Sequence, residues 1–135
     1  MKYLLDTDIC IYIINQKPAK VLDRFRQQKA GDIGVSSISV AELAFGVAKS
    51  GSSRNRAALD LFLPHMEIAR FDEDAALIYG EVRTVLEKSG KPIGPLDMLI
   101  AAHALALNVT LVTNNQKEFS RAPLIKRGLK VENWA

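Results

Sequence analysis

Three carboxylates, Asp6, Glu42 and Asp97, stand at places where a polar stretch meets an apolar one. Asp6 interrupts the apolar run LLDTDICIYI, Glu42 lies in SSISVAELAFG, and Asp97 follows the proline and glycine of GKPIGPLDML. Carboxylates that converge beside buried apolar segments repel one another and lose hydration unless a cation compensates them. Oxygen ligands without histidine or cysteine favour Mg²⁺ or Mn²⁺, which bind substrate phosphates directly. The set therefore indicates phosphodiester chemistry assisted by a metal.

Each carboxylate also has a purely structural interpretation. Ser39 and Glu42 have the spacing of a capping box, in which Glu42 would bond only the backbone N–H of Ser39. Asp97 in the first turn of a helix would complement the helix dipole, and Asp8 would act as an N-cap. The metal interpretation is favoured only if Asp6, Glu42 and Asp97 meet in space.

Strands and helices are predicted to alternate along the chain. Apolar segments predict strands at 2–5, 32–36, 67–71, 109–113 and 129–132. Capping residues and apolar spacing predict helices at 9–14 (capped by Thr7 or Asp8), 18–31, within 37–51, 57–63, 72–90 and 95–107. The residues NNQKEF after the fourth strand are predicted to form a loop. Strands this short and apolar indicate an α/β fold, with a parallel sheet covered by helices on both faces.

Such a sheet would bring the polar residues together. Parallel strands end at one edge, where the following helices begin and where ligands bind. Asp6 would leave the first strand, Glu42 would follow the second, and Asp97 would begin the helix before the fourth. Thr113 and Asn115 would leave the fourth strand at the same edge. We therefore predict that residues far apart in sequence line one rim of the sheet.

The overall composition is that of one ordinary domain spanning residues 1–135. Nearly half of the residues, 48%, are apolar, and no segment reaches the about 18 uncharged apolar residues of a membrane span. An acid interrupts the start before a signal-like apolar core forms, so we expect a cytoplasmic protein. Cys10 and His103 lie in apolar runs and are predicted to be core residues. A net charge of +3 permits a polyanionic partner such as nucleic acid.

Four segments in order, LLDTDICIYI, SSISVAELAFG, GKPIGPLDMLIAAHAL and LVTNNQKEF, resemble the PIN-domain ribonucleases, and specifically the VapC toxins of bacterial type II toxin–antitoxin pairs. The resemblance implies a PIN-like α/β/α sandwich with a central, mostly parallel, twisted β-sheet. It implies a Mg²⁺- or Mn²⁺-dependent endoribonuclease that is a homodimer and is neutralised by a VapB antitoxin. It further implies that the enzyme cuts initiator tRNA in the anticodon stem-loop, which inhibits translation. Operator DNA would be bound only through the complex with the antitoxin.

The resemblance also assigns roles to residues. Asp6, Glu42 and Asp97 match the three acidic metal-site positions of the family. A fourth acid often follows the fourth strand, but here the neutral Asn115 occupies that position, and Glu118 would supply the missing charge through water. The hydroxyl groups of Thr7 and Thr113 would contact the metal ligands without binding the metal themselves.

Two other functions compete with this interpretation. A D-x-D sequence after an apolar strand also begins the haloacid-dehalogenase phosphatases, in which Asp6 would be the nucleophile and Asp8 its partner. Those enzymes usually need a longer chain with a lysine and a later acidic pair. The second alternative is a catalytically inactive PIN domain that only scaffolds a partner.

Overall fold

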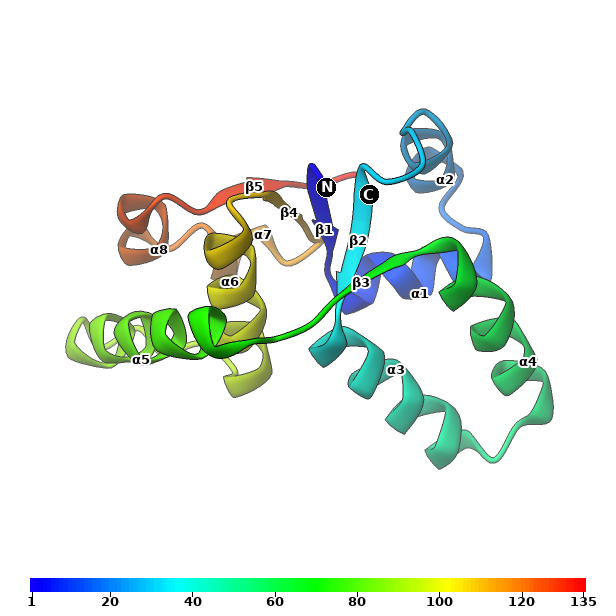
Figure 1. The fold of residues 1–135 in the computed structure, drawn as a ribbon, viewed down its shortest axis with the longest axis horizontal. Coiled ribbons are helices and arrows are strands. Elements are labelled where there is room, and N and C mark those ends of the chain that lie inside the picture. The colour runs from blue at the N-terminus through cyan, green and yellow to red at the C-terminus, as the bar shows by residue number, and fades with distance from the viewer.

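The computed structural model describes residues 1–135 and shows five strands surrounded by helices (Figure 1). The elements in chain order are β1 (Tyr3–Leu5), α1 (Thr7–Asn15), α2 (Ala19–Arg26), β2 (Ile33–Ser36), α3 (Ser37–Ser50), α4 (Ser53–Phe62), a 3₁₀ turn (Leu63–His65), β3 (Glu67–Ala69), α5 (Glu73–Lys88), α6 (Pro95–Leu107), β4 (Thr110–Val112), α7 (Gln116–Phe119), α8 (Ala122–Arg127) and β5 (Lys130–Glu132). None of these helices combines the length and the apolar character needed to cross a membrane.

The five strands form one parallel sheet in the order β3-β2-β1-β4-β5. The chain first builds outward from β1 to β2 and β3, and then returns to place β4 on the other side of β1. The direction of winding therefore reverses between β1 and β4, and this reversal opens a crevice at the carboxyl ends of those strands. This edge lies at the bottom of Figure 1, where α1 and α3 begin and where the first turn of α6 lies.

Helices cover both faces of the sheet, which confirms the predicted α/β/α sandwich. Leu4 and Leu111 point into a core formed with α5, α6 and α8. Their neighbours Leu5 and Val112 point to the opposite face, into a core formed with α1 to α4. Because neighbouring side chains alternate between two buried faces, the strands are apolar at successive positions. Cys10 is fully buried in the second core, as predicted.

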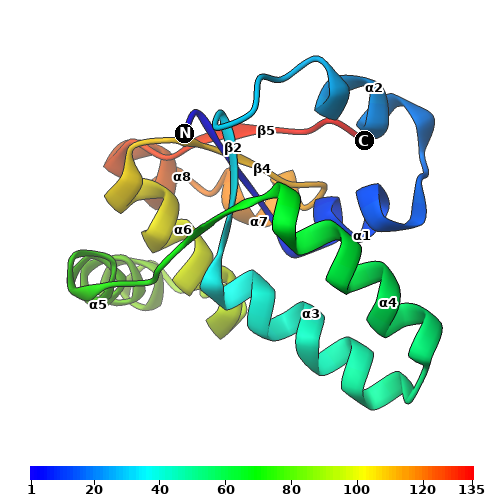
Figure 2. The ribbon, with the colours of Figure 1, turned by 45° about the vertical axis from the view of Figure 1, so that its right-hand side comes forward.

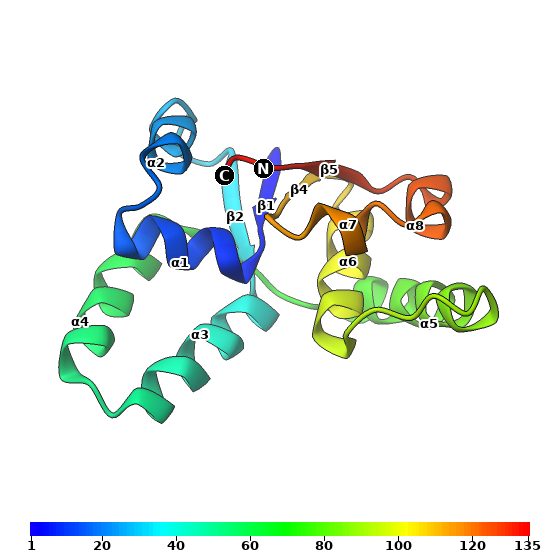
Figure 3. The same cartoon turned by 180° about the vertical axis from the view of Figure 1, so that it is seen from behind.

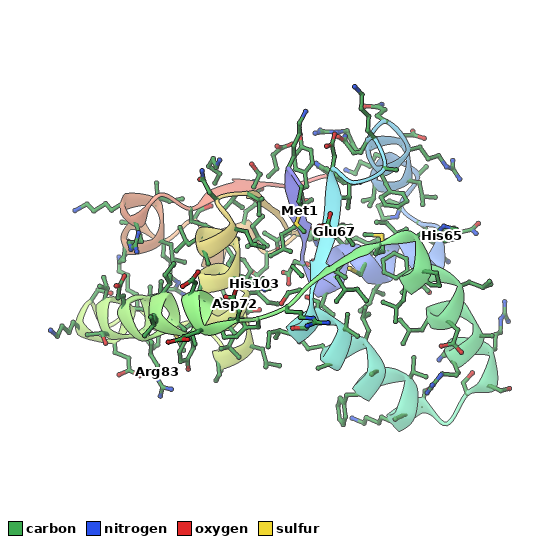
Figure 4. The ribbon with its side chains drawn as sticks, in the orientation of Figure 1. Met1, His65, Glu67, Asp72, Arg83 and His103 are labelled. Carbon is green, nitrogen blue, oxygen red and sulfur yellow. The ribbon has the colours of Figure 1, made fainter.

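The helices lie on the two sides of the sheet in a way that frames its carboxyl edge. Seen from behind, α1 and α2 lie on one side and α6 to α8 on the other (Figure 3). The pair α3 and α4 extends away from the sheet as an antiparallel hairpin (Figure 2). At β2, Gly34 is needed because a β-carbon there would lie 2.9 Å from the Glu67 carbonyl oxygen and would also meet the Met1 side chain, which packs over it (Figure 4).

The caps of two helices differ from the prediction. Helix α1 begins one residue after Asp6, which is its N-cap, so the predicted caps Thr7 and Asp8 both lie inside the helix. Helix α3 is capped by Ser36, whose Oγ accepts a hydrogen bond from the Ile38 N–H at 3.0 Å. The alternative of a capping box at Ser39 is therefore excluded, because Ser39 already lies in the first turn. This leaves the Glu42 carboxylate available for other contacts.

Other helix ends agree with the prediction. Asp72 caps α5 by accepting from the Ala75 N–H at 3.1 Å. Pro95 is the first residue of α6, and Asn108 ends that helix in the left-handed conformation at φ 54°. Helix α2 ends at Arg26 instead of Gly31, because the last apolar side chain of its inner face is Phe25 and nothing beyond it anchors another turn.

The segment after β4 is helical, not the predicted loop. The Asn115 carbonyl accepts hydrogen bonds from the backbone N–H groups of Glu118 and Phe119, and these bonds begin the short helix α7. Phe119 is fully buried in the core with Leu124 of α8. The short helices α7 and α8 are each stabilised by burial of one apolar side chain. Their local sequence has no apolar periodicity that would predict a helix.

Candidate active site

Asp6 is held in the crevice between β1 and β4. Its Oδ1 accepts from the Thr7 N–H at 2.8 Å, and its Oδ2 accepts from the Thr113 hydroxyl at 2.8 Å. The side chain is only 6% exposed. Burial is the main reason that the pKa of Asp6 rises to about 6, and the charge of Asp8 adds to it, while the two hydrogen bonds oppose the rise. Asp6 is therefore a fixed carboxylate that holds its negative charge at a cost.

Glu42 reaches the same crevice from the second turn of α3. Its Oε1 accepts a hydrogen bond from the Thr7 hydroxyl at 2.8 Å. Thr7 thus contacts two of the predicted ligands, since its backbone bonds Asp6 and its side chain bonds Glu42. The contact replaces the predicted capping interaction, and it joins the first turn of α1 to α3.

Asp97 comes from the first turn of α6 and faces the other carboxylates. Its pKa rises to about 7, first because of partial burial, then because it shares a hydrogen bond with Glu118, and further because Asp6, Glu118 and Glu42 are negatively charged. All three predicted ligands therefore lie within electrostatic reach of one another. The raised pKa means that Asp97 is partly protonated near neutral pH.

Glu118 is the fourth acid of the site. The Asn115 side-chain amide donates to Glu118 Oε2 at 3.1 Å, and the Asn115 backbone N–H donates to Thr113 Oγ1 at 2.9 Å. Asn115 therefore orients Glu118 and supports the hydroxyl that orients Asp6. The Thr7 and Thr113 hydroxyls each donate to a predicted ligand, as expected for supporting groups. Glu118 contacts Asp97 directly by a side-chain hydrogen bond, a contact that the spacing of the sequence does not show.

Asp8 has a different role from the predicted N-cap. Its two carboxylate oxygens accept from the Ile9 N–H at 2.7 Å and the Asn114 N–H at 3.2 Å. Asn114 in turn donates from its amide to the Tyr12 hydroxyl at 2.9 Å. Asp8 therefore fastens α1 to the loop after β4, beside the crevice. Sequence analysis did not identify Tyr12 or Asn114, because these contacts join residues about a hundred positions apart.

No positive side chain neutralises this cluster. The ion pairs of the molecule are Lys2–Asp32, Arg24–Glu132, Arg56–Asp60, Arg83–Glu87 and Arg127–Glu81. None of them involves Asp6, Glu42, Asp97 or Glu118. The pKa values of Asp6 and Asp97 are raised and no counter-charge is paired with the cluster, so a cation would bind favourably there.

The donor set fits a hard divalent cation. All the donors are oxygens, and Mg²⁺ usually takes only one or two carboxylates and keeps several waters. As the side chains stand, no three of the acidic, histidine or cysteine groups lie close enough together to hold an ion between them. Glu42 is engaged with Thr7 and Glu118 with Asn115 and Asp97, so direct binding by all of them would require these side chains to turn.

A cavity of about 320 Å³ adjoins Glu42 between α1, α3 and α4. Its walls are mostly apolar and include Ile11, Ile14, Val47 and Leu59. Ile11 is 43% exposed there, although it belongs to a helix that packs on the sheet. The cavity therefore extends the crevice with an apolar surface that leads away from the carboxylates.

Comparison with known proteins identifies the family of the chain. The family model described as PIN domain matches residues 3–124. The chain belongs to the PIN-domain family. This PIN domain is 47% identical over 136 residues to "Ribonuclease VapC2" of Rickettsia felis, with 99% of this chain and 98% of that protein covered. It is 38% identical over 136 residues to "tRNA(fMet)-specific endonuclease VapC" of Shigella flexneri, with 100% and 99% covered.

A solved structure shows the same fold. The crystal structure of VapBC2 from Rickettsia felis bound to a DNA fragment from their promoter matches with a TM-score of 0.87 and 45% identity, covering 100% of each chain. Within the PIN-domain family, the chain therefore belongs to the VapC ribonucleases of toxin–antitoxin systems, as the four sequence segments indicated.

Proposed function

We propose that this PIN domain is a Mg²⁺- or Mn²⁺-dependent endoribonuclease and the toxin of a VapBC toxin–antitoxin pair. The observation that carries the proposal is the cluster of acids at the crevice between β1 and β4, which contains only oxygen donors and has no positive side chain to balance it. The VapC relatives that cover its whole length are named ribonucleases and support the choice of RNA as substrate.

The residues of the site would divide the work of hydrolysis. Asp6 and Asp97 would hold the metal, and Glu42 would join them or bind through water. A divalent ion bound there would activate water and neutralise charge on the transferred phosphate. Thr113 and Thr7 would keep the Asp6 and Glu42 carboxylates oriented during the reaction. Asp97 would exchange a proton with the site near neutral pH, because its pKa is about 7.

Initiator tRNA, cut in the anticodon stem-loop, is the substrate that we propose. The name of the Shigella flexneri relative, tRNA(fMet)-specific endonuclease, supports this choice. Loop shape and phosphate contacts would give specificity, and the exposed side chains of Lys88, Lys91 and Lys117 are available for such contacts. Binding of tRNA should therefore weaken steeply as salt increases.

A VapB antitoxin would neutralise the enzyme by covering the crevice. The apolar cavity beside Glu42 would receive an apolar segment of the antitoxin, and a positive side chain on that segment would balance the acids. The related structure contains both proteins and a promoter DNA fragment, which supports operator binding through the complex. We also propose that the toxin is a cytoplasmic homodimer, as in the family that it resembles.

The haloacid-dehalogenase interpretation loses its support. Both Asp6 oxygens accept hydrogen bonds, and both Asp8 oxygens hold backbone N–H groups, so Asp8 does not face a substrate bound at Asp6. The inactive-scaffold alternative predicts no cleavage of RNA, and the experiment below separates it from the proposal.

Total tRNA incubated with the purified protein should be cut in Mg²⁺ or Mn²⁺ and left intact in EDTA. Attack by water on the phosphorus, with departure of the 3′-oxygen, leaves a 3′-hydroxyl on one fragment and a 5′-phosphate on the other. Sequencing of the fragment ends should show these groups and one dominant site in initiator tRNA. Ends with a 2′,3′-cyclic phosphate would contradict the metal-dependent route. Co-expression with the neighbouring antitoxin gene should suppress the same cuts in cells.

A Thr7→Val substitution tests whether the hydroxyl on Glu42 matters for cleavage. Valine has the same shape but cannot donate to Glu42 Oε1, so Glu42 loses its fixed orientation. We expect cleavage to fall by about ten- to a hundredfold at limiting Mg²⁺. Thr110→Val is the control, because Thr110 is half-buried in β4 and its hydroxyl makes no hydrogen bond. Equal cleavage by both variants would show that Thr7 has no role in the site.

A further inference from the structure

Helix α6 is joined to the half of the molecule that carries Glu42 by a single side-chain hydrogen bond. His103 Nδ1 lies 2.8 Å from Ser36 Oγ, and both residues are buried, with exposures of 1% and 0%. Apart from Asp97 at the rim, no other side chain of α6 makes a hydrogen bond to another element. His103 is therefore the only polar link between α6 and the start of α3.

Ser36 lies at the junction of β2 and α3, so its hydrogen bond to His103 acts on the start of the helix that carries Glu42. It is the last residue of β2 and the N-cap of α3, and its Oγ accepts from the Ile38 N–H at 3.0 Å. Glu42 lies six residues after Ser36, and Asp97 lies six residues before His103. Six helical residues rise about 9 Å and turn the side chain to another face. His103 thus lies away from Asp97 on α6, and Ser36 lies away from Glu42 at the start of α3.

Stability alone does not account for a histidine at this position. The Nε2 atom is buried and has no hydrogen-bond partner. The Arg70 main chain and the Asp72 carboxylate favour the charged ring, but burial outweighs them and lowers the pKa of His103. The ring packs edge-on against Phe71 at 5.4 Å between centroids, and Figure 4 shows it on α6 beside the start of α5. An apolar side chain would avoid the unpaired Nε2 atom, and Ser36 Oγ would still accept from the Ile38 N–H.

We propose that His103 is a positioning residue for the active site. Through Ser36 it sets the register of α6 against α3, and this register fixes the separation of Asp97 from Glu42. The proposal rests on the proposed metal-dependent function, since its effect is on how well the two carboxylates share a cation. His103 itself touches neither the metal nor the RNA.

Three substitutions at His103 separate positioning from packing. Asparagine places its amide near the position of Nδ1 and can restore the bond to Ser36, whereas glutamine places its amide near Nε2 and leucine has no polar group. We expect His103→Leu and His103→Gln to raise the Mg²⁺ concentration for half-maximal cleavage about tenfold. His103→Asn should stay within about threefold of wild type by the same comparison.

Mn²⁺ binding, measured by calorimetry without RNA, gives a readout independent of activity. It should weaken in the leucine variant and recover in the asparagine variant, while thermal unfolding in EDTA shows the leucine variant to be no less stable than wild type. Ile100→Val is the control, because Ile100 is fully buried in α6 but makes no polar link. This control should leave the Mn²⁺ affinity unchanged.

Several outcomes would overturn the proposal. Wild-type Mn²⁺ affinity in His103→Leu would show that the link does not govern the site. Equal rescue by glutamine and asparagine, or an equal loss in Ile100→Val, would show a packing effect. If wild type binds Mn²⁺ but cuts no RNA, the proposed ribonuclease function fails, while a loss in the leucine variant and recovery in the asparagine variant would still support positioning by His103.

Discussion

An Asp97→Asn variant is expected to lose RNA cleavage by at least about a thousandfold and to unfold at a higher temperature than wild type at pH 8 in EDTA. Asparagine keeps the size of the side chain but cannot supply a negative charge to a cation. It also removes a carboxylate that Asp6, Glu118 and Glu42 repel, as the rise in its pKa to about 7 indicates. The substitution therefore removes activity and at the same time removes electrostatic repulsion from the folded state.

Asp74→Asn provides the matched control for this variant. Asp74 also lies in the first turn of a helix, α5, but it is exposed and makes no hydrogen bond or ion pair with the acidic cluster. It should leave cleavage unchanged and lower stability slightly, because it removes a favourable interaction with the helix dipole. Gel assays of cleavage and thermal unfolding measure both effects. Normal cleavage by Asp97→Asn in Mg²⁺ would show that the site is wrongly assigned.

The metal-free protein is expected to lose stability as the pH rises from 4 to 8. The pKa values of Asp6, about 6, and Asp97, about 7, are above the ordinary value of 3.8, so the folded state binds more protons than the unfolded state in this range. Stability from these groups is complete below pH 4 and falls until the pH exceeds 7. The free energy of unfolding should fall by about 2 kcal/mol. This is less than the sum of the two pKa shifts, because Asp97 is partly exposed and because Asp6 and Asp97 share a single electrostatic repulsion.

Mg²⁺ should reverse this loss at pH 8. An ion that binds only the folded protein, at a hundred times its dissociation constant, stabilises it by about 2.7 kcal/mol. The melting temperature should therefore rise by about 5 to 10 °C. At pH 4.5 Asp6 and Asp97 are largely protonated, and the same addition of Mg²⁺ should change the melting temperature little. A melting temperature that is independent of Mg²⁺ at both pH values would contradict a divalent-ion site, and Asp97→Asn should show a reduced response.

Much of the fold follows from local sequence. Continuous apolar strands such as Leu4–Leu5 and Leu111–Val112 predict a doubly covered parallel sheet, because both faces of each strand must be buried. Caps at Asp72 and Pro95 act within one helical turn, so their effect can be read from neighbouring residues. The helices after β4 were not predictable, because burial of Phe119 by distant residues stabilises them.

The sequence by itself determined which acids could form a site and that the ends of parallel strands would bring them to one edge. Asp6, Glu42 and Asp97 were identified in this way, and the resemblance to the PIN-domain ribonucleases added the supporting hydroxyls of Thr7 and Thr113. Only the tertiary structure decided their partners. Glu42 bonds Thr7 and not its own helix terminus, Glu118 lies beside Asp97, and the His103 ring meets Ser36 across 67 positions of the chain.

The physical reason for this division is the range of the forces involved. Helix caps and side-chain alternation depend on residues within a few positions, whereas the hydrogen-bond partner and pKa of a side chain depend on whichever elements pack around it. Spacing in the sequence carries no information about those elements until the chain has folded.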